Sequence, residues 1–246
     1  MRVMRFSARI RRFKGLYTGR RCFVIGNGPS LKSQDLSRLS GEVSLASNLF
    51  VLHPQFPRIR LKYLCLSDPK FWDSGALEPS IDYAIQQHQE LRVFVESDIV
   101  RHKRNWRMFP QERTFIYRLD KTHTVYDGHF SLDPSRCTNH GHTVIIDIAI
   151  PLALYMGCTE IYMLGCDCDY RLSEAPDHGA GYFYDIASQQ SRIGDLGYLQ
   201  NYWPKYVFDS YAVVRQRVEE GGRRIFNATA GGKLEVFPRV EYDSLF

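Results

Sequence analysis

The sequence contains 246 residues, enough for one large α/β domain with a full hydrophobic core. Hydrophobic residues make up 44% and charged residues 24%, a composition that is typical of soluble globular proteins and excludes a largely disordered chain. The longest apolar run, residues 144–156, contains Asp147 and Pro151 and is shorter than the ~20 residues that a membrane-spanning helix needs. We therefore expect a cytoplasmic protein, either fully soluble or peripheral on the inner face of the cell membrane.

The net charge of +5 is concentrated at the N-terminus, because no acidic residue precedes Asp35. The basic residues of this segment are Arg2, Arg5, Arg9, Arg11, Arg12, Lys14, Arg20 and Arg21. Apolar residues recur there every three or four positions: Val3, Phe6, Ile10, Phe13 and Tyr17. Two interpretations stay open for this segment: an amphipathic helix on an anionic membrane surface, which Gly15 disfavours, and a solvated basic tail that packs lightly on the domain.

Short apolar runs rich in β-branched residues alternate with helical patterns along the rest of the chain. The predicted strands are Cys22–Ile25, Val43–Ala46, Lys62–Leu66, Arg92–Val95, Thr114–Tyr117, Glu160–Leu164 and Arg224–Phe226. The predicted helices are Pro79–Gln89, Thr143–Met156 with a kink at Pro151, and Tyr206–Glu220. We expect a basic N-terminal segment, 1–20, and one Rossmann-like domain, 21–246: a mostly parallel sheet with helices on both faces. Residues 120–142 and 168–200 lack either pattern and are typical of binding loops or lids.

Six cysteines are present, and three of them, Cys22, Cys65 and Cys166, fall inside or at the end of predicted strands. Cysteine in a buried strand behaves as a small apolar residue. Cys166 and Cys168 are separated by one residue, which is not the spacing of a redox pair, and no second pair has zinc-binding spacing. The sequence therefore predicts reduced thiols.

The first predicted strand ends in Gly26-Asn27-Gly28-Pro29-Ser30. In an open parallel sheet, ligands bind beyond the carboxyl ends of the strands, and glycine lets a ligand approach the main chain there. The following amides could meet a phosphate, and Asn27 offers both a donor and an acceptor. A tight turn with no ligand is the alternative, because the motif is neither a dinucleotide fingerprint nor a P-loop.

Polar residues also follow the next predicted strands. Ser47 and Asn48 end the second strand, and Ser67 and Asp68 end the third. Asp167 and Asp169 follow the strand Glu160–Leu164, where they could contact a ribose or Mg²⁺ or simply cap the turn. These positions predict a shared pocket at one edge of the sheet.

The chain resembles the family 42 sialyltransferases in the segments FVIGNGPSLKSQDLSRL, LASNLF and GCTEIYMLGCDCDY, the last followed by GAGYFYD. It is also similar to bacterial domains of the hydroxymethylpterin-pyrophosphokinase-like type, many of which belong to gene sets for surface polysaccharides such as lipopolysaccharide. The resemblance extends from about Arg21 to about Thr229 at the level of gapped motifs.

The resemblance to the sialyltransferases implies a CMP-linked acidic sugar as donor and no metal cofactor. It implies donor contacts by Asn27 and Asn48, and places Asp68 where those enzymes have an asparagine. It also implies that Tyr170 and Tyr182 assist the departing phosphate. A neutral phenol suits that role because it can donate to developing negative charge.

The general base is where the chain departs from that family. The histidine that serves as base in that family has no counterpart near YLQNYWPKY in this sequence. The candidates are therefore His178 and the cluster His140-Gly141-His142, from which we select His142. Asp68 and Asp185 are further candidates for the base. The two histidines of the cluster could instead bind a metal together with Asp167 and Asp169, although phosphate contact or helix capping is the simpler role.

The expected function is therefore a metal-independent glycosyltransferase that modifies a cell-surface glycan. One alternative is Mg²⁺-dependent diphosphate transfer from ATP, with the ion held by Asp68, Asp167 or Asp169. The other is a sugar-nucleotide-binding module without activity. The expected partners are a nucleotide-sugar donor, a glycan acceptor, an anionic membrane surface at residues 1–21 and a second copy of the chain, and not nucleic acid, despite the basic stretch at residues 101–107.

Overall fold

The computed structural model describes residues 8–67, 78–102, 109–169, 182–183 and 203–246. Seven parallel strands form its central sheet, in the order β5-β4-β3-β2-β1-β8-β9. The strands are β1 (Arg21–Ile25), β2 (Ser44–Ser47), β3 (Tyr63–Leu66), β4 (Arg92–Glu96), β5 (Thr114–Tyr117), β8 (Glu160–Leu164) and β9 (Arg224–Asn227). All seven predicted strands are present within one or two residues of the expected bounds.

The chain order of the strands changes direction at β1. Strands β1 to β5 follow one another outward, and the chain then returns to place β8 on the other side of β1. Cys22 of β1 pairs with Ile161 of β8, while Phe23 pairs with Ser44 of β2. The connections after β1 and after β8 therefore leave the sheet in opposite directions, which makes the carboxyl end of β1 a topological switch point.

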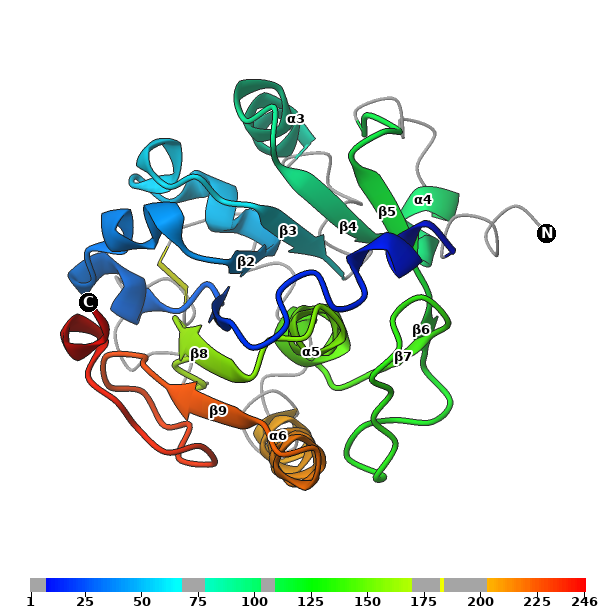
Figure 1. Ribbon diagram of the computed structural model, residues 1–246, viewed down its shortest axis with the longest axis vertical. Helices are drawn as coiled ribbons and strands as arrows, with labels where there is room; N and C mark the ends of the chain where they lie inside the picture. The colour runs from blue at the N-terminus through cyan, green and yellow to red at the C-terminus, as the bar shows by residue number, and fades with distance from the viewer. Residues whose placement is uncertain (1–7, 68–77, 103–108, 170–181, 184–202) are drawn as a thin grey trace.

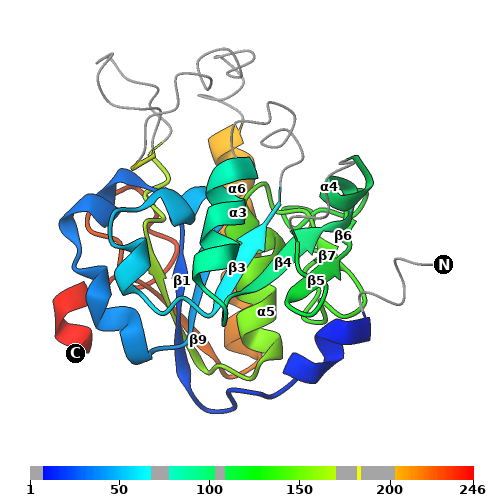
Figure 2. The same cartoon turned by 90° about the horizontal axis from the view of Figure 1, so that it is seen from above.

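Alternating side chains of each strand divide the core into two layers, one on each face of the sheet. On one face, Val24 and Leu45 pack with α5 (Ile150–Tyr155) and α6 (Trp203–Glu220). On the other face, Ile25 packs beneath a series of short 3₁₀ helices and α3. These elements are η2 (Pro29–Ser33), η3 (Leu36–Gly41), η4 (Asn48–Leu52), η5 (Phe56–Arg58) and α3 (Glu78–Gln87). The predicted α/β class with helices on both faces is confirmed (Figures 1 and 2).

The basic N-terminal segment contains η1 (Ala8–Phe13), which lies beside β5 at the amino end of the sheet (Figures 1 and 2). Its Ile10 and Phe13 side chains are buried in the core, and Phe13 makes edge-on ring contacts with Phe94 and Phe115 at 5.2 and 4.7 Å. The described part of the segment is thus neither a regular α-helix nor a lightly packed tail. Of the apolar side chains that would face a membrane, the described ones Ile10, Phe13 and Tyr17 pack against the domain instead.

The apolar run 144–156 forms two kinds of helix. Residues Ile145–Ala149 are a π-helix, η7, and α5 starts at Ile150. We expected a kink at Pro151, but the change of hydrogen-bonding pattern one residue earlier places this proline in the first turn of α5. The lost amide hydrogen costs least there.

The remaining described elements are short. A two-stranded parallel sheet, β6 (Leu119–Asp120) with β7 (Thr138–Asn139), braces the region 120–142 that the sequence predicted to be irregular. The others are α4 (Ser97–His102) and η10 (Tyr242–Leu245). No helix among the described residues is long and apolar enough to cross a membrane. All six cysteines lie in described residues, and none of them forms a disulfide.

Candidate functional site at the carboxyl edge of the sheet

The turn after β1 packs directly against the end of β8. A Cβ atom on Gly26 would lie 2.4 Å from the carbonyl oxygen of Gly165, and one on Gly28 would lie 1.7 Å from Oδ2 of Asp167. Both distances are far below van der Waals contact, so only glycine fits at either position. The close approach that these glycines permit is therefore an approach of one strand end to another.

The amides of this turn bond within the protein. Those of Gly26 and Gly28 donate to the carbonyl oxygens of Leu164 and Gly165, both at 2.8 Å, and that of Ser30 donates to Oδ1 of Asp167 at 3.1 Å. We expected these amides to meet a phosphate, but β8 satisfies them because it lies next to β1 in the sheet. Binding by Gly26, Gly28 and Ser30 stays a prediction, and it would require other atoms of the turn.

Asp167 fixes the turn and is nearly buried. Besides accepting from the Ser30 amide, its carboxylate accepts from the Ser30 hydroxyl at 2.7 Å, and Lys233 donates its amide to the Asp167 carbonyl at 2.7 Å. Burial raises the pKa of this carboxyl above its ordinary value, against the lowering effect of the Ser30 hydrogen bonds. Its role here is to hold two chain segments together. Among the described residues, no three His, Cys, Asp or Glu side chains are grouped as a metal site.

Asn27 joins the ends of β1 and β2. Its side-chain nitrogen donates to the carbonyl and hydroxyl oxygens of Ser47, at 3.0 and 2.9 Å. Its side-chain oxygen is buried, and none of the described residues donates a hydrogen bond to it. A buried acceptor without a donor costs about 1–3 kcal/mol, so this oxygen is a natural point for a ligand donor to bind.

A chain of hydrogen bonds continues from there across the edge of the sheet. Oδ1 of Asn48 accepts from the amide of Ser67 at 3.3 Å, and the Ser67 hydroxyl donates to Oδ2 of Asp147 at 3.0 Å. Oδ1 of Asp147 accepts from the amide of Gly141 at 2.7 Å and lies 3.4 Å from Nδ1 of His140. This buried carboxylate thus links the end of β3 to the histidine loop. Sequence reasoning missed its role, although an acid inside an apolar helical run was the available signal.

His142 lies in an aromatic cluster with Tyr126 and Tyr206. Its ring is stacked on Tyr206 with 5.4 Å between centroids and lies 5.5 Å from Tyr126 and 4.5 Å from His140. Burial lowers the pKa of His142 to about 4, with a smaller contribution from His140, so its ring is neutral at pH 7. Its Nε2 is buried, with no hydrogen-bond partner among the described residues.

Three residues other than glycine have a left-handed backbone in the described chain: Asn48, His142 and Cys168, with φ values of 43°, 66° and 49°. All three follow strands or loops that end at the carboxyl edge of the sheet. Such a conformation is uncommon outside glycine and clusters at functional sites, because the surrounding structure must enforce it. The π-helix η7, which supplies Asp147, is a second irregularity of that kind.

Tyr182 lies close to this edge because its neighbour is bonded to the β1 turn. The amide of Phe183 donates to the carbonyl oxygen of Asn27 at 2.9 Å, and the Phe183 ring packs on His53 with centroids 4.9 Å apart. The structure thus places Asn27, Asn48, Asp167 and Tyr182 at this edge, together with the predicted turn residues Gly26, Gly28, Pro29 and Ser30. The predicted residues Asp68, Tyr170, His178 and Asp185 lie outside the described residues.

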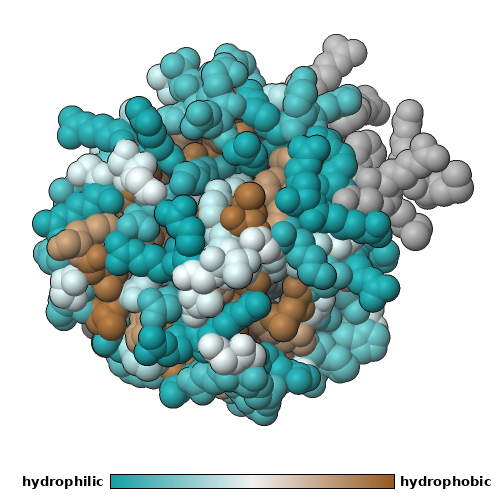
Figure 3. All heavy atoms as spheres, viewed as in Figure 1, coloured by the Kyte–Doolittle hydropathy of each residue, from teal (hydrophilic) through white to brown (hydrophobic). Residues whose placement is uncertain are grey.

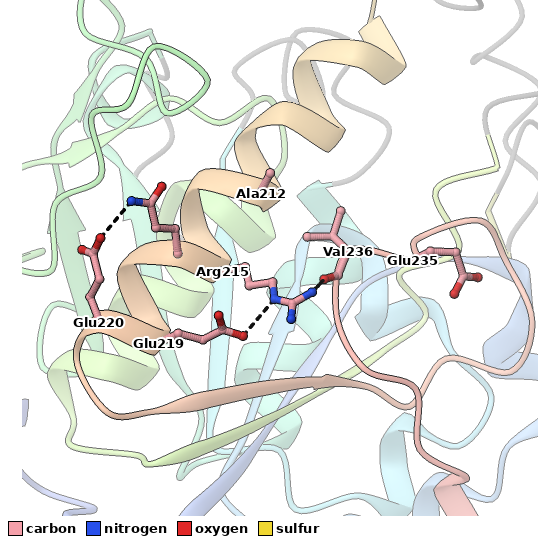
Figure 4. Close-up of a pocket in the computed structure, with 7 residues that line it drawn as sticks. Ala212, Arg215, Glu219, Glu220, Glu235 and Val236 are labelled. Atoms are coloured by element: carbon pink, nitrogen blue, oxygen red, sulfur yellow. Dashed lines mark hydrogen bonds and ion pairs between the residues drawn. The ribbon is translucent and has the colours of Figure 1, made fainter.

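A depression of about 600 Å³ lies elsewhere, between α6 and the segment around Val236 (Figure 4). Arg215 crosses it, donating to Oε1 of Glu219 at 2.8 Å and to the carbonyl oxygen of Val236 at 2.7 Å. Its polar side chains are exposed and have partners: Arg215 with Glu219, Gln216 with Glu220, and Glu235 with Arg239 outside the depression. It therefore lacks the buried, unpartnered groups of the carboxyl edge. We therefore place the candidate site at the carboxyl edge.

Comparisons with protein-family models, with characterised proteins and with solved structures give no significant match to this chain.

Proposed function

We propose that the protein is a glycosyltransferase that binds a CMP-activated acidic sugar at the carboxyl edge of its sheet and transfers the sugar to a glycan hydroxyl without a metal. The observation that carries the proposal is the concentration of left-handed backbone conformations along the carboxyl edge of the sheet, which contains the switch point. Asn48, His142 and Cys168 all have φ between 43° and 66°, and the unpartnered side-chain oxygen of Asn27 lies at the same edge. A purely structural edge would have no reason to maintain that strain.

The chemistry of the edge suits a neutral polar ligand portion such as a ribose or a pyrimidine. The Asn27 oxygen needs a donor, which a ribose hydroxyl or the amino group of cytosine supplies. The neutral ring of His142 can accept or donate a hydrogen bond without adding charge. Tyr182, next to the turn, supports the proposal because a phenol can donate to the departing phosphate. The family resemblance supports the choice of CMP over other nucleotides.

The proposed acceptor is a surface glycan or its lipid-linked precursor. We propose that the enzyme works at the cytoplasmic face of the membrane, with exposed cations of the N-terminal segment, such as Arg11 and Lys14, contributing attraction to anionic lipid. Ile10 and Phe13 are committed to the core, so this attraction is electrostatic and will weaken with salt.

Isothermal titration with CMP tests the proposal. We expect binding in the micromolar to millimolar range that is unchanged by EDTA, and weaker binding by the variant Asn27→Ala. Turnover of a CMP-sugar donor panel in the presence of EDTA should then release CMP. Binding of ATP over CMP that requires Mg²⁺ would replace this function with diphosphate transfer, and CMP-sugar binding without turnover would leave a binding module.

A further inference from the structure

The two outer strands of the central sheet, β9 and β5, are covered in different ways. Along β9 the backbone of the C-terminal segment supplies the bonds. The amide of Asn227 donates to the carbonyl oxygen of Pro238 at 2.8 Å, and the amide of Val240 donates to that of Asn227 at 3.1 Å. Along β5 a side chain, that of Arg9 in η1, supplies them. An outer strand needs cover because its unpaired amides and carbonyls are a template for another strand.

The carbonyl groups that Arg9 binds point away from the sheet. The amide of Val93 in β4 donates to the carbonyl oxygen of Arg113 at 2.9 Å, so that carbonyl faces β4. Successive carbonyls of a strand alternate in direction, and those of Glu112 and Thr114 therefore face outward. The guanidinium of Arg9 donates from Nη1 to the oxygen of Thr114 at 3.2 Å and from Nη2 to that of Glu112 at 3.1 Å. One side chain thus occupies two acceptors that a neighbouring strand would use.

Packing holds Arg9 in this position as well. Its guanidinium carbon lies 5.0 Å from the ring centroid of Phe115, and that of Arg12 lies 5.7 Å from the same centroid. Cation–π attraction therefore adds to the two hydrogen bonds. Ile10 and Phe13 of η1 are buried, so the element cannot leave β5 without exposing core side chains. The cover is a fixed part of the fold.

The strand beneath this cover has a composition that favours pairing. Thr114–Tyr117 reads Thr-Phe-Ile-Tyr, four residues with high β propensity and neither charge nor proline. Every copy of the chain has the same edge, so two β5 strands could pair antiparallel about a two-fold axis. A second copy of the chain is therefore the partner that this edge fits.

We propose that the outer edge of β5 is a strand-pairing surface for a second copy of this chain, and that Arg9 keeps it closed. Arg9 occupies the outward carbonyls of Glu112 and Thr114, which the second strand would need. Together with Arg12 it also places positive charge where the same charges of another copy would approach, and like charges across an interface disfavour association. The inference does not depend on the proposed glycosyltransferase activity, because η1 lies at the amino end of the sheet.

Replacing Arg9 should open the edge. In sedimentation velocity over a range of concentrations, we expect the weight-average mass of Arg9→Ala to rise toward twice that of the wild type at the same concentrations. Hydrogen–deuterium exchange in residues 112–118 should slow in the associated protein, since the outward amides of Thr114 and Ile116 would then be bonded. A mass equal to that of the wild type at every concentration would overturn the inference. Association without slower exchange in that peptide would overturn it too.

Two further variants separate the carbonyl bonds from the charge. Arg11→Ala removes a positive charge from the same helix at an exposed side chain, and we expect it to keep the wild-type mass. Arg9→Lys keeps the charge but lacks the fork that bonds two carbonyls, so we expect it to associate, though less than Arg9→Ala.

The outcome of these controls decides the role of Arg9. Equal association of Arg11→Ala and Arg9→Ala would show that charge alone is responsible, and a wild-type mass for Arg9→Lys would show that the carbonyl bonds are not needed. Either result would overturn the inference. Melting temperatures are measured alongside, and Arg9→Lys carries the test if Arg9→Ala does not fold.

Discussion

The two edges of the central sheet differ in the backbone conformation of the residues that lie there. At the amino edge, where the face in Figure 3 is mostly covered by hydrophilic side chains, none of the described residues other than glycine has a left-handed backbone. Arg21 donates to Glu42 at 2.6 Å and to the carbonyl oxygen of Leu245 at 2.8 Å, and the hydroxyls of Tyr17 and Tyr63 are bonded to each other at 2.8 Å. These contacts join distant chain segments and stabilise the fold.

At the carboxyl edge of the same sheet, three residues other than glycine have a left-handed backbone that the surrounding structure must enforce. The left-handed residues Asn48, His142 and Cys168 all lie there. Buried side-chain atoms without a hydrogen-bond partner do not distinguish the edges among the described residues, because Ser44 and Thr114 at the amino edge also have one each. Strained backbone does distinguish them. Our proposal assigns ligand binding to the carboxyl edge and mainly structural contacts to the amino edge, and the variants below test that division.

The largest effect on stability should come from Phe13→Ala at the amino edge. Phe13 is 2% exposed and touches the rings of Tyr63, Phe94 and Phe115. Truncating a buried phenylalanine costs about 3–5 kcal/mol in the free energy of unfolding. Urea denaturation measures this, with Leu16→Ala, 51% exposed, as a control expected within about 0.5 kcal/mol of wild type. Loss of CMP affinity in the folded fraction of Phe13→Ala would contradict the separation of stability and ligand binding between the two edges.

A smaller loss of stability, accompanied by a loss of binding, should follow Gly28→Ala at the carboxyl edge. The new Cβ would meet Oδ2 of Asp167 at 1.7 Å and the carbonyl oxygen of Gly165 at 2.8 Å, so a backbone atom as well as a side chain must move. Overpacking of this kind costs about 1–3 kcal/mol, and the shift of the turn should weaken CMP binding. Gly41→Ala is the control, since a Cβ atom at that position would have no neighbouring atom within 4 Å. Unchanged CMP affinity in Gly28→Ala would show that the turn after β1 is not part of the CMP-binding site.

The next effect depends on pH and concerns His142. Because its pKa in the folded protein is lowered from 6.5 to about 4, the neutral ring is favoured by folding. The stability that follows is present above pH 6.5 and is lost as pH falls toward 4. Wild type should lose about 1–2 kcal/mol more than His142→Gln in the free energy of unfolding between pH 7 and pH 4. This value is smaller than the pKa shift alone would give, because solvent screens a half-buried ring. Denaturation at pH 7, 5.5 and 4 measures it, and equal pH dependence in both proteins would contradict the buried placement of His142.

The smallest effect should come from Glu42→Gln at the amino edge. Glu42 and Arg21 are 19% and 32% exposed, and ion pairs near the surface contribute about 0–1 kcal/mol. The loss should diminish further at high salt. CMP affinity should not change, and a measurable change would mean that the two edges are coupled.

Most of the fold could be predicted from the sequence because its signals are local. A buried parallel strand needs a short apolar run, and all seven runs were visible. The π-helix was not visible, because it arises where Asp147 is held by Ser67, 80 positions away in sequence. The docking of Ile10 and Phe13 was equally hidden, since periodicity shows that a face is apolar without showing what covers it.

The site was predicted by position and less well by role. The ends of β1, β2 and β8 do converge, as the parallel arrangement requires. Asp167, however, bonds to the turn after β1, and the amides of Gly26 and Gly28 bond to carbonyl oxygens at the end of β8. The register of neighbouring strands determines which polar groups form hydrogen bonds within the protein and which remain available to a ligand. A single sequence does not specify that register. The pairing of His140 with Asp147 was hidden for the same reason.

The most direct test of a ligand site at the carboxyl edge is hydrogen–deuterium exchange with and without saturating CMP. The account predicts slower exchange in the peptides that follow β1, β2 and β8 and in the histidine loop, covering residues 26–31, 47–52, 138–147 and 165–169. Peptides of the amino edge, such as residues 8–20, should exchange at the same rate in both states. Protection confined to α6 and the Val236 segment, or no protection at saturating CMP, would contradict it.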